Sequence, residues 1–180
     1  NTTLSGGDSL HHFTTSPVIG TVQPIRVWAI GDFGRGNSQQ RQVHESYTNF
    51  AGNDHTDVWL WLGDNAYETG TDSEYQANVF DGPNGYEDIF KYMPFMPCPG
   101  NHDYLSVSPP TSSISPPSHS GPYFDMVEVP TQGEMGGEPS GMEAFYSFDY
   151  GNTHFISINS EIGSLLSSTN CWIGVYEEFN

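Results

Sequence analysis

Basic residues are scarce in this sequence of 180 residues. Arg26, Arg35, Arg41 and Lys91 stand against 22 acidic residues, so the formal net charge is −18. A surface of this sign repels the phosphate backbone of nucleic acids and the headgroups of anionic membranes. We therefore expect neither a nucleic acid nor a membrane as a partner, whereas small ligands are not excluded.

Cysteine and long apolar runs are scarce as well. The two cysteines, Cys98 and Cys171, define no disulfide framework. Cys98 lies in an apolar run, which favours a buried thiol over half of a disulfide. No stretch is long and apolar enough to span a bilayer as a helix.

Aromatic residues, in contrast, are plentiful, with 11 Phe, 10 Tyr and 4 Trp. A chain of this length and composition can bury one sizeable core, so a single domain is expected. Residues 1–24 are polar and irregular and are expected to form an N-terminal arm. The domain is expected to occupy residues 25–180.

Buried strands and helical patterns alternate between residues 25 and 100. Short apolar runs predict strands that are buried on both faces, and apolar residues at helical spacing predict the helices between them. The expected strands are residues 26–30, 58–62 and 95–98. One helix is expected between residue 37 or 38 and Gly52, and a short one around residues 86–93. This order is typical of an α/β domain with parallel strands.

The first of these helices has clear end signals. Asn37 or Ser38 is expected to cap its start, and Gly52 is expected to end it. Val43, Tyr47, Phe50 and Ala51 recur at helical spacing between these signals. The histidine on this helix, His44, is expected at the surface.

The second half of the chain has a different character. Residues 104–142 are dense in Ser, Pro and Gly and predict a long loop, either a surface insertion or a lid on the substrate side. Two further runs, residues 144–150 and 153–159, flank the pair Gly151-Asn152 and predict a β-hairpin.

Each of the first three strands ends in glycine followed by a polar residue that can bind a metal. The segments are Ile30-Gly31-Asp32, Leu62-Gly63-Asp64-Asn65 and Pro99-Gly100-Asn101-His102-Asp103. The carboxyl ends of parallel strands meet at one edge of a sheet, where sites form in open α/β folds. Asp32, Asp64 and Asn101 would supply hard oxygen ligands, which suit a divalent or trivalent cation.

These motifs resemble those of the calcineurin-like metallophosphoesterases. The resemblance rests on Gly-Asp-Phe-Gly (31–34), Gly-Asp-Asn-Ala-Tyr (63–67) and Gly-Asn-His-Asp (100–103), and Tyr67 makes it closest to the purple acid phosphatases. It covers residues 25–161. It implies an α/β fold of the metallophosphoesterase type, a layered β-sandwich with flanking helices.

The resemblance also implies a binuclear metal centre, with Fe(3+) plus a second divalent metal (Fe, Zn or Mn). By this likeness Asp32 binds one metal and Asp64 bridges both. Tyr67 binds the ferric ion, with a charge-transfer colour, and Asn101 binds the second metal.

Two catalytic roles come from the same likeness. His102 is expected to contact the substrate or to protonate the leaving group, and Asp103 is expected to orient His102. The substrate would be a small phosphate ester, and the habit of the family together with the acidic composition favours a secreted or periplasmic protein.

The sequence departs from the family in its histidines. The family takes further ligands from a later His and from a Gly-His-x-His motif, and neither is present. We expect a metallophosphoesterase fold that is incomplete at the C-terminus, either a fragment of a longer product or a divergent short protein.

Three functions fit these observations. The first is an acid phosphatase-like hydrolysis of phosphate monoesters, which Tyr67 favours. The second is a metal-dependent phosphodiesterase or nucleotidase on the same fold. The third is a non-catalytic half-domain that serves binding or assembly.

Overall fold

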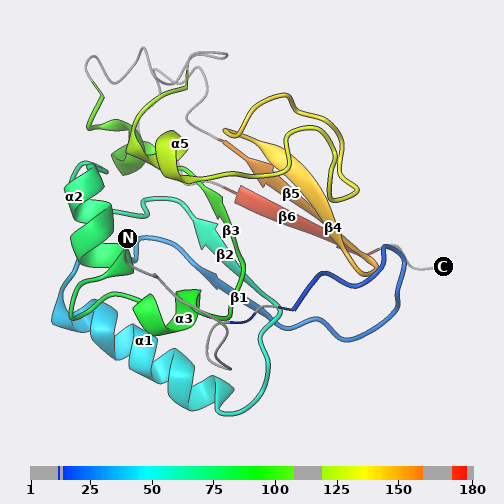
Figure 1. The fold of residues 1–180 in the computed structure, drawn as a ribbon, viewed down its shortest axis with the longest axis horizontal. Helices are drawn as coiled ribbons and strands as arrows, with labels where there is room; N and C mark the ends of the chain where they lie inside the picture. Colours follow the sequence, from blue (N-terminus) through cyan, green and yellow to red (C-terminus); the bar gives the residue numbers. More distant parts are fainter. Residues whose placement is uncertain (1–11, 13, 108–118, 160–171, 178–180) are drawn as a thin grey trace, which may run out of the picture.

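The structure is a computed structural model that describes residues 12, 14–107, 119–159 and 172–177. Within these residues the strands form two three-stranded sheets (Figure 1). The parallel sheet has the order β1 (Val27–Ile30), β2 (Val58–Leu62), β3 (Phe95–Cys98). The antiparallel sheet has the order β4 (Tyr146–Tyr150), β5 (Thr153–Ile158), β6 (Trp172–Glu177).

The helices and turns between the strands are short, apart from the first. They are α1 (Ser38–Ala51), α2 (Asp72–Glu74), the π-helical turn η1 (Tyr75–Phe80), α3 (Glu87–Phe90), the 3₁₀ turn η2 (Asn101–Tyr104) and α5 (Pro122–Met126). The order strand, helix, strand, helix, strand is therefore confirmed for the first hundred residues, as is the hairpin β4–β5.

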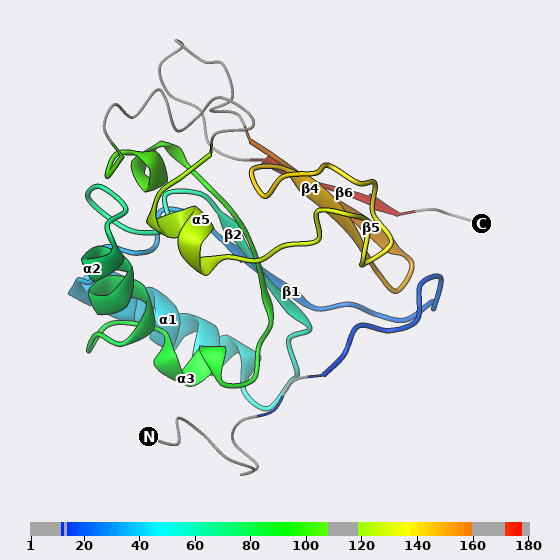
Figure 2. The ribbon, with the colours of Figure 1, turned by 45° about the horizontal axis from the view of Figure 1, so that its top comes forward.

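The molecule is layered, with β2 in the middle. Trp59 and Trp61 project from one face of β2 into an aromatic core that includes residues of η1 and α3. Val58 and Leu60 project from the other face onto the antiparallel sheet. Figures 1 and 2 agree with this arrangement, because α1 and α3 lie on one side of the parallel sheet and β4–β6 on the other. The predicted α/β sandwich with flanking helices is confirmed.

Both cores are rich in aromatic rings. On the helical side, the ring of Phe33 lies 5.1 Å from that of Trp61 and 5.4 Å from that of Trp59, centroid to centroid. Phe33 belongs to the loop after β1, so this packing holds that loop onto the sheet. On the other side, Phe148 and Phe155 stack at 4.8 Å. Burial of such rings is a major source of stability for a small domain.

β1 differs from its prediction. It was expected to be buried on both faces, but Val27 is 37% exposed and the burial alternates along the strand. The reason is that β1 lies at an edge of the described parallel sheet, whereas β2, with a neighbour on each side, is buried except at Leu62.

The ends of α1 are as predicted, but the side chains that it buries include polar ones. The side chain of Asn37 accepts from the backbone N–H of Gln40, and Gly52 ends the helix with a φ of 57°. Of the apolar residues at helical spacing, Val43 and Phe50 are exposed, the latter at 88%, whereas Tyr47 is half-buried and its ring stacks 3.8 Å from that of Trp28. The fully buried side chains of the helix are Gln40 and His44. The expectation that His44 lies at the surface is therefore wrong.

Partners far away in the chain explain why Gln40 and His44 are buried. The amide of Gln40 donates to the carbonyl oxygens of Asn78 and Asn84, at 2.5 and 2.7 Å. The His44 ring packs 5.0 Å from that of Tyr86, and its Nε2 lies 3.3 Å from Asp88. Polar side chains that find buried partners can outcompete apolar ones for the inner face.

Further expectations concerned Cys98, the long loop and the N-terminal arm. Cys98 takes part in a disulfide bond, so the expected free thiol is wrong. The predicted loop over residues 104–142 contains the end of η2 and all of α5, and its residues 108–118 lie outside the described part. Residues 14–24 form no helix or strand. Most of the expected arm before residue 14 lies outside the described residues. Within the described residues, no helix has the length and apolar character needed to cross a membrane.

Candidate metal centre

The loops after β1, β2 and β3 converge at one edge of the parallel sheet. The backbone N–H of Asp32 donates to the carbonyl of Gly63 at 3.1 Å, so the first two loops are in direct contact. Asp32 and Asp64 both have positive φ, at 56° and 52°. This left-handed conformation is uncommon for residues other than glycine and is often found at functional sites.

An oxygen cluster forms where these loops meet. The Tyr67 hydroxyl donates to Oδ1 of Asp32 in a short hydrogen bond and lies 3.3 Å from Oδ2 of Asp64. Burial raises the pKa of the Tyr67 phenol above its usual value, and the hydrogen bond to Asp32 and the charges of both carboxylates raise it further. The phenol proton is thus held among three oxygens that would otherwise repel one another.

The third loop joins the cluster through Asp64. Its Oδ1 accepts from the backbone N–H of His102 at 2.9 Å. Asn101, the preceding residue, is exposed at the start of η2. The structure therefore brings Asp32, Asp64 and Tyr67 into direct contact. Asn101 lies on the adjoining loop and makes no side-chain hydrogen bond to them among the described residues.

Close approach of the second and third loops requires glycine at position 100. A Cβ atom there would clash with the backbone nitrogen and Oδ1 of Asp64. At this strand end, the glycine before the polar motif residues is therefore required because no side chain fits there.

The orientation of His102 comes from a residue that the sequence did not indicate. Its Nδ1 lies 2.6 Å from the backbone carbonyl oxygen of Glu68. Because a carbonyl can only accept, Nδ1 carries the proton in this pair, which leaves Nε2 for other partners. The His102 ring also packs 4.6 Å from the Tyr67 ring.

Asp103 does not orient His102, which corrects that expectation. Its carboxylate is buried and accepts from the backbone N–H groups of Asn65 and Gly100, the Asn65 amide and the Tyr75 hydroxyl. Among the described residues no hydrogen bond links it to the His102 ring. Burial raises the pKa of the Asp103 carboxyl to about 6, although the bonds from Tyr75, Gly100 and Asn65 lower it. Asp103 instead ties the second strand-end loop to the third.

Two charged residues beside the cluster were also missed. The Arg35 guanidinium carbon lies 3.7 Å from the centroid of the Tyr67 ring, and its Nη1 lies 3.1 Å from Oε1 of Glu68. Arg35 is one of four basic residues and follows the first motif directly, which was a usable signal. The sequence held no such signal for Glu68, because the group that orients His102 is the backbone carbonyl of Glu68 and not its side chain.

The donor set fits a hard cation. Two carboxylates, one phenol and a nearby amide are oxygen donors of the type that Fe(3+) and Mg²⁺-like ions prefer. No group of three or more His, Cys, Asp and Glu side chains with metal-binding geometry occurs in the part of the chain that the structure describes. What the described residues bring together here is the oxygen cluster of Asp32, Asp64 and Tyr67.

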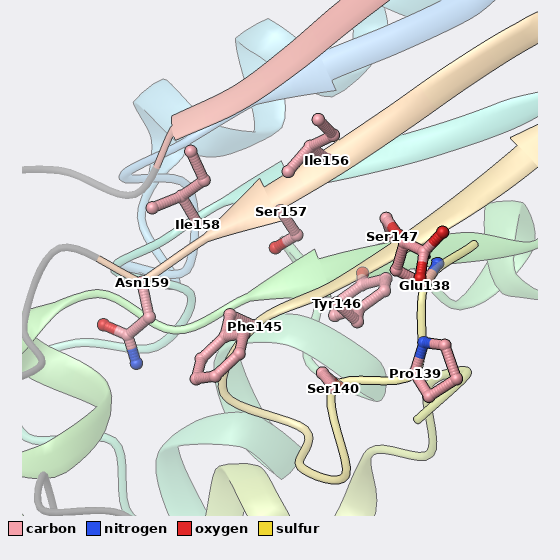
Figure 3. Close-up of a pocket in the computed structure, with 10 residues that line it drawn as sticks. All are labelled: Glu138, Pro139, Ser140, Phe145, Tyr146, Ser147, Ile156, Ser157, Ile158 and Asn159. Carbon is pink, nitrogen blue, oxygen red and sulfur yellow. The ribbon is translucent and has the colours of Figure 1, made fainter. Parts of the chain in front are cut away.

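A cavity lies on the antiparallel sheet. It measures about 420 Å³ and lies between the loop 138–140 and strands β4 and β5 (Figure 3). Apolar side chains such as Phe145 and Ile156 line most of it. None of the predicted site residues contributes to it, so it is separate from the oxygen cluster.

Comparison with known proteins agrees with the motifs. The calcineurin-like phosphoesterase family matches residues 25–168, which is most of the chain, and the chain belongs to this family. Acid phosphatase type 7 of Danio rerio is similar, with 26% identity over 132 residues. The matched part makes up 73% of this chain and 24% of that relative, so the chain spans about a quarter of the relative's length. The predicted resemblance to the superfamily is thus confirmed.

Proposed function

We propose that this chain carries the first part of the active site of an acid phosphatase-like enzyme that hydrolyses phosphate monoesters at a binuclear metal centre. The observation that carries the proposal is the Tyr67 hydroxyl between the carboxylates of Asp32 and Asp64. Membership of the phosphoesterase family supports the reaction type, and the likeness to an acid phosphatase supports the monoester.

Each oxygen of the cluster has a defined part in this proposal. Asp32 and Tyr67 would hold Fe(3+), and Asn101 would hold the second metal (Fe, Zn or Mn). Asp64 would help to hold both metals. Its Oδ2 lies 3.3 Å from the Tyr67 hydroxyl, and its Oδ1 accepts from the backbone N–H of His102, next to Asn101. When bound, the metals would supply an activated water and positive charge for the phosphoryl oxygens.

His102 is the proposed proton donor. The hydrogen bond from Nδ1 to the Glu68 carbonyl fixes the ring and directs the exchange of protons to Nε2. A protonated Nε2 can give its proton to the leaving alkoxide, which removes the cost of expelling an anion. Asp103 stabilises this arrangement, because its carboxylate links the loops that carry Asp64 and His102.

The test is hydrolysis by the full chain after loading with Fe(3+) and Zn²⁺. We expect p-nitrophenyl phosphate to be cleaved faster than bis-p-nitrophenyl phosphate. Asp64→Asn should lower the rate by at least about 100-fold, because loss of a residue that only supports a metal ligand already costs up to about 100-fold. Asp149→Asn, a carboxylate on the antiparallel sheet, is the matched control and should have little effect.

The alternatives give different results. Preference for the diester would favour a phosphodiesterase or nucleotidase. Retained metal without hydrolysis of either ester would favour a non-catalytic half-domain. Secretion or export to the periplasm, which we propose on the same family likeness, is tested separately by locating the native protein in cell fractions.

A further inference from the structure

Arg35 is the basic side chain at the oxygen cluster. The other three form ion pairs away from it: Arg26 with Asp54, Arg41 with Glu45 and Lys91 with Glu87, at 2.8, 2.9 and 3.0 Å. Arg35 lies on the Tyr67 ring and is 45% exposed. In a chain with a net charge of −18, this guanidinium is a permanent positive charge beside the cluster that can attract a second anion.

A cavity of about 180 Å³ adjoins Arg35 and Asp32. Its wall includes Asp32, which belongs to the oxygen cluster, and Gln39 at the start of α1. This volume holds roughly six water-sized groups, so it suits a small substituent and not a polymer. Because Asp32 is shared, a phosphoryl group bound at the cluster would have the cavity beside it.

The polar groups of this cavity differ in their availability. The Gln40 amide is committed to the carbonyls of Asn78 and Asn84, and its carbonyl oxygen accepts from the Gly36 N–H. The Gln39 side chain makes no hydrogen bond within the described residues. The Arg35 guanidinium is paired with Glu68, whose side chain is 72% exposed. An exposed pair of this kind is weak and can exchange for another anion at little cost.

We propose that this cavity is the subsite for the leaving group and that Arg35 makes it selective for phosphate esters whose alcohol bears a second anionic group, such as a carboxylate. The substrate anion replaces the Glu68 carboxylate on the guanidinium, and the Gln39 amide is available as a further donor. This inference rests on the proposed phosphoesterase function, and it names the class of ester that the site prefers.

The test compares phosphoglycolate with its neutral carboxamide, using the metal-loaded full chain. The wild type should show a higher kcat/KM for the carboxylate ester, mainly through a lower KM. Arg35→Gln should reduce the ratio of the two kcat/KM values about tenfold, the size expected for one charge-assisted hydrogen bond. Glu68→Gln, which frees the guanidinium and keeps the backbone carbonyl, should raise the ratio.

Arg26→Gln is the matched control. Arg26 is as exposed as Arg35, 45% in each case, and its partner Asp54 is 70% exposed. The same charge is removed at the far end of β1, so the ratio should not change. If Arg35→Gln slowed both esters equally, the guanidinium would contact the phosphoryl group itself and the proposed subsite would be wrong.

A binding measurement separates this inference from the function on which it rests. Calorimetry with phosphonoacetate and its amide, neither of which is hydrolysed, should give tighter binding of the carboxylate and loss of that preference in Arg35→Gln. A chain that cleaves neither ester but keeps this preference would contradict the phosphoesterase function and support the subsite. Equal binding of both compounds would overturn the subsite whether or not hydrolysis occurs.

Discussion

The two sheets handle their acidic side chains in different ways. On the antiparallel sheet, Asp149 pairs with His154, its direct neighbour across the hairpin, at 2.6 Å. At the edge of the parallel sheet, Asp32 and Asp64 come from different loops and share the hydroxyl of Tyr67. The hairpin gives its carboxylate a partner on the neighbouring strand, whereas the parallel edge gathers negative charge that a cation can satisfy.

The difference follows from topology. An antiparallel hairpin places partners opposite each other, so an acid and a base can be paired by register alone. Parallel strands point their carboxyl ends the same way, so their loops collect at one edge. Substitutions matched between the two sheets can therefore separate packing effects from effects on the site.

The largest expected difference is between two glycines. Gly100→Ala would place a methyl group against Asp64 and should destabilise the fold by about 3 kcal/mol, the upper range for overpacking. Gly141, near the antiparallel sheet, has open space around it but a φ of 70°. Gly141→Ala should cost only about 1 kcal/mol, the strain of a left-handed residue. Urea denaturation measures both, and equal losses would mean that the strand-end loops are not tightly packed.

The next comparison is between two carboxylates. Asp103→Asn would set an amide N–H against the donors of Asn65 and Gly100 and should cost about 2 kcal/mol. Asp149→Asn weakens one partly exposed pair and should cost less than about 1 kcal/mol. Thermal unfolding of both variants gives the order, and a reversed order would show that Asp103 does not hold the loops together.

The smallest expected effect concerns Tyr67. Without added metal, Tyr67→Phe removes one shared hydrogen bond and should cost about 1 kcal/mol. With Fe(3+) added, the variant should also lack the visible charge-transfer band that we expect for the wild type. An unchanged band in Tyr67→Phe would exclude the phenol as an iron ligand.

Much of this molecule could be predicted from its sequence because the signals are local. Each Gly-Asp or Gly-Asn pair directly follows its strand, so the motif and its place at the sheet edge are read together. The caps of α1 and the turn at Gly151 are local in the same sense. The mixed parallel and antiparallel layers follow from these elements.

What the sequence did not reveal depends on distant partners. The inward face of α1 is decided by residues such as Asn78 and Asp88, far from Gln40 and His44 in the chain. The acceptor for His102 is a backbone carbonyl, which any residue type would offer. Asp103 lies next to His102 in sequence, yet its carboxylate turns toward Asn65. Adjacency in the chain is therefore a poor guide to which groups meet in a site.

The most direct test of the account is the metal content of the purified chain after loading and dialysis, measured by elemental analysis. We predict that the wild type and Asp149→Asn retain metal, including iron, and that Asp64→Asn retains essentially none. A wild-type chain without bound metal, or an Asp64→Asn chain with as much metal as the wild type, would contradict the claim that the parallel edge is a metal centre.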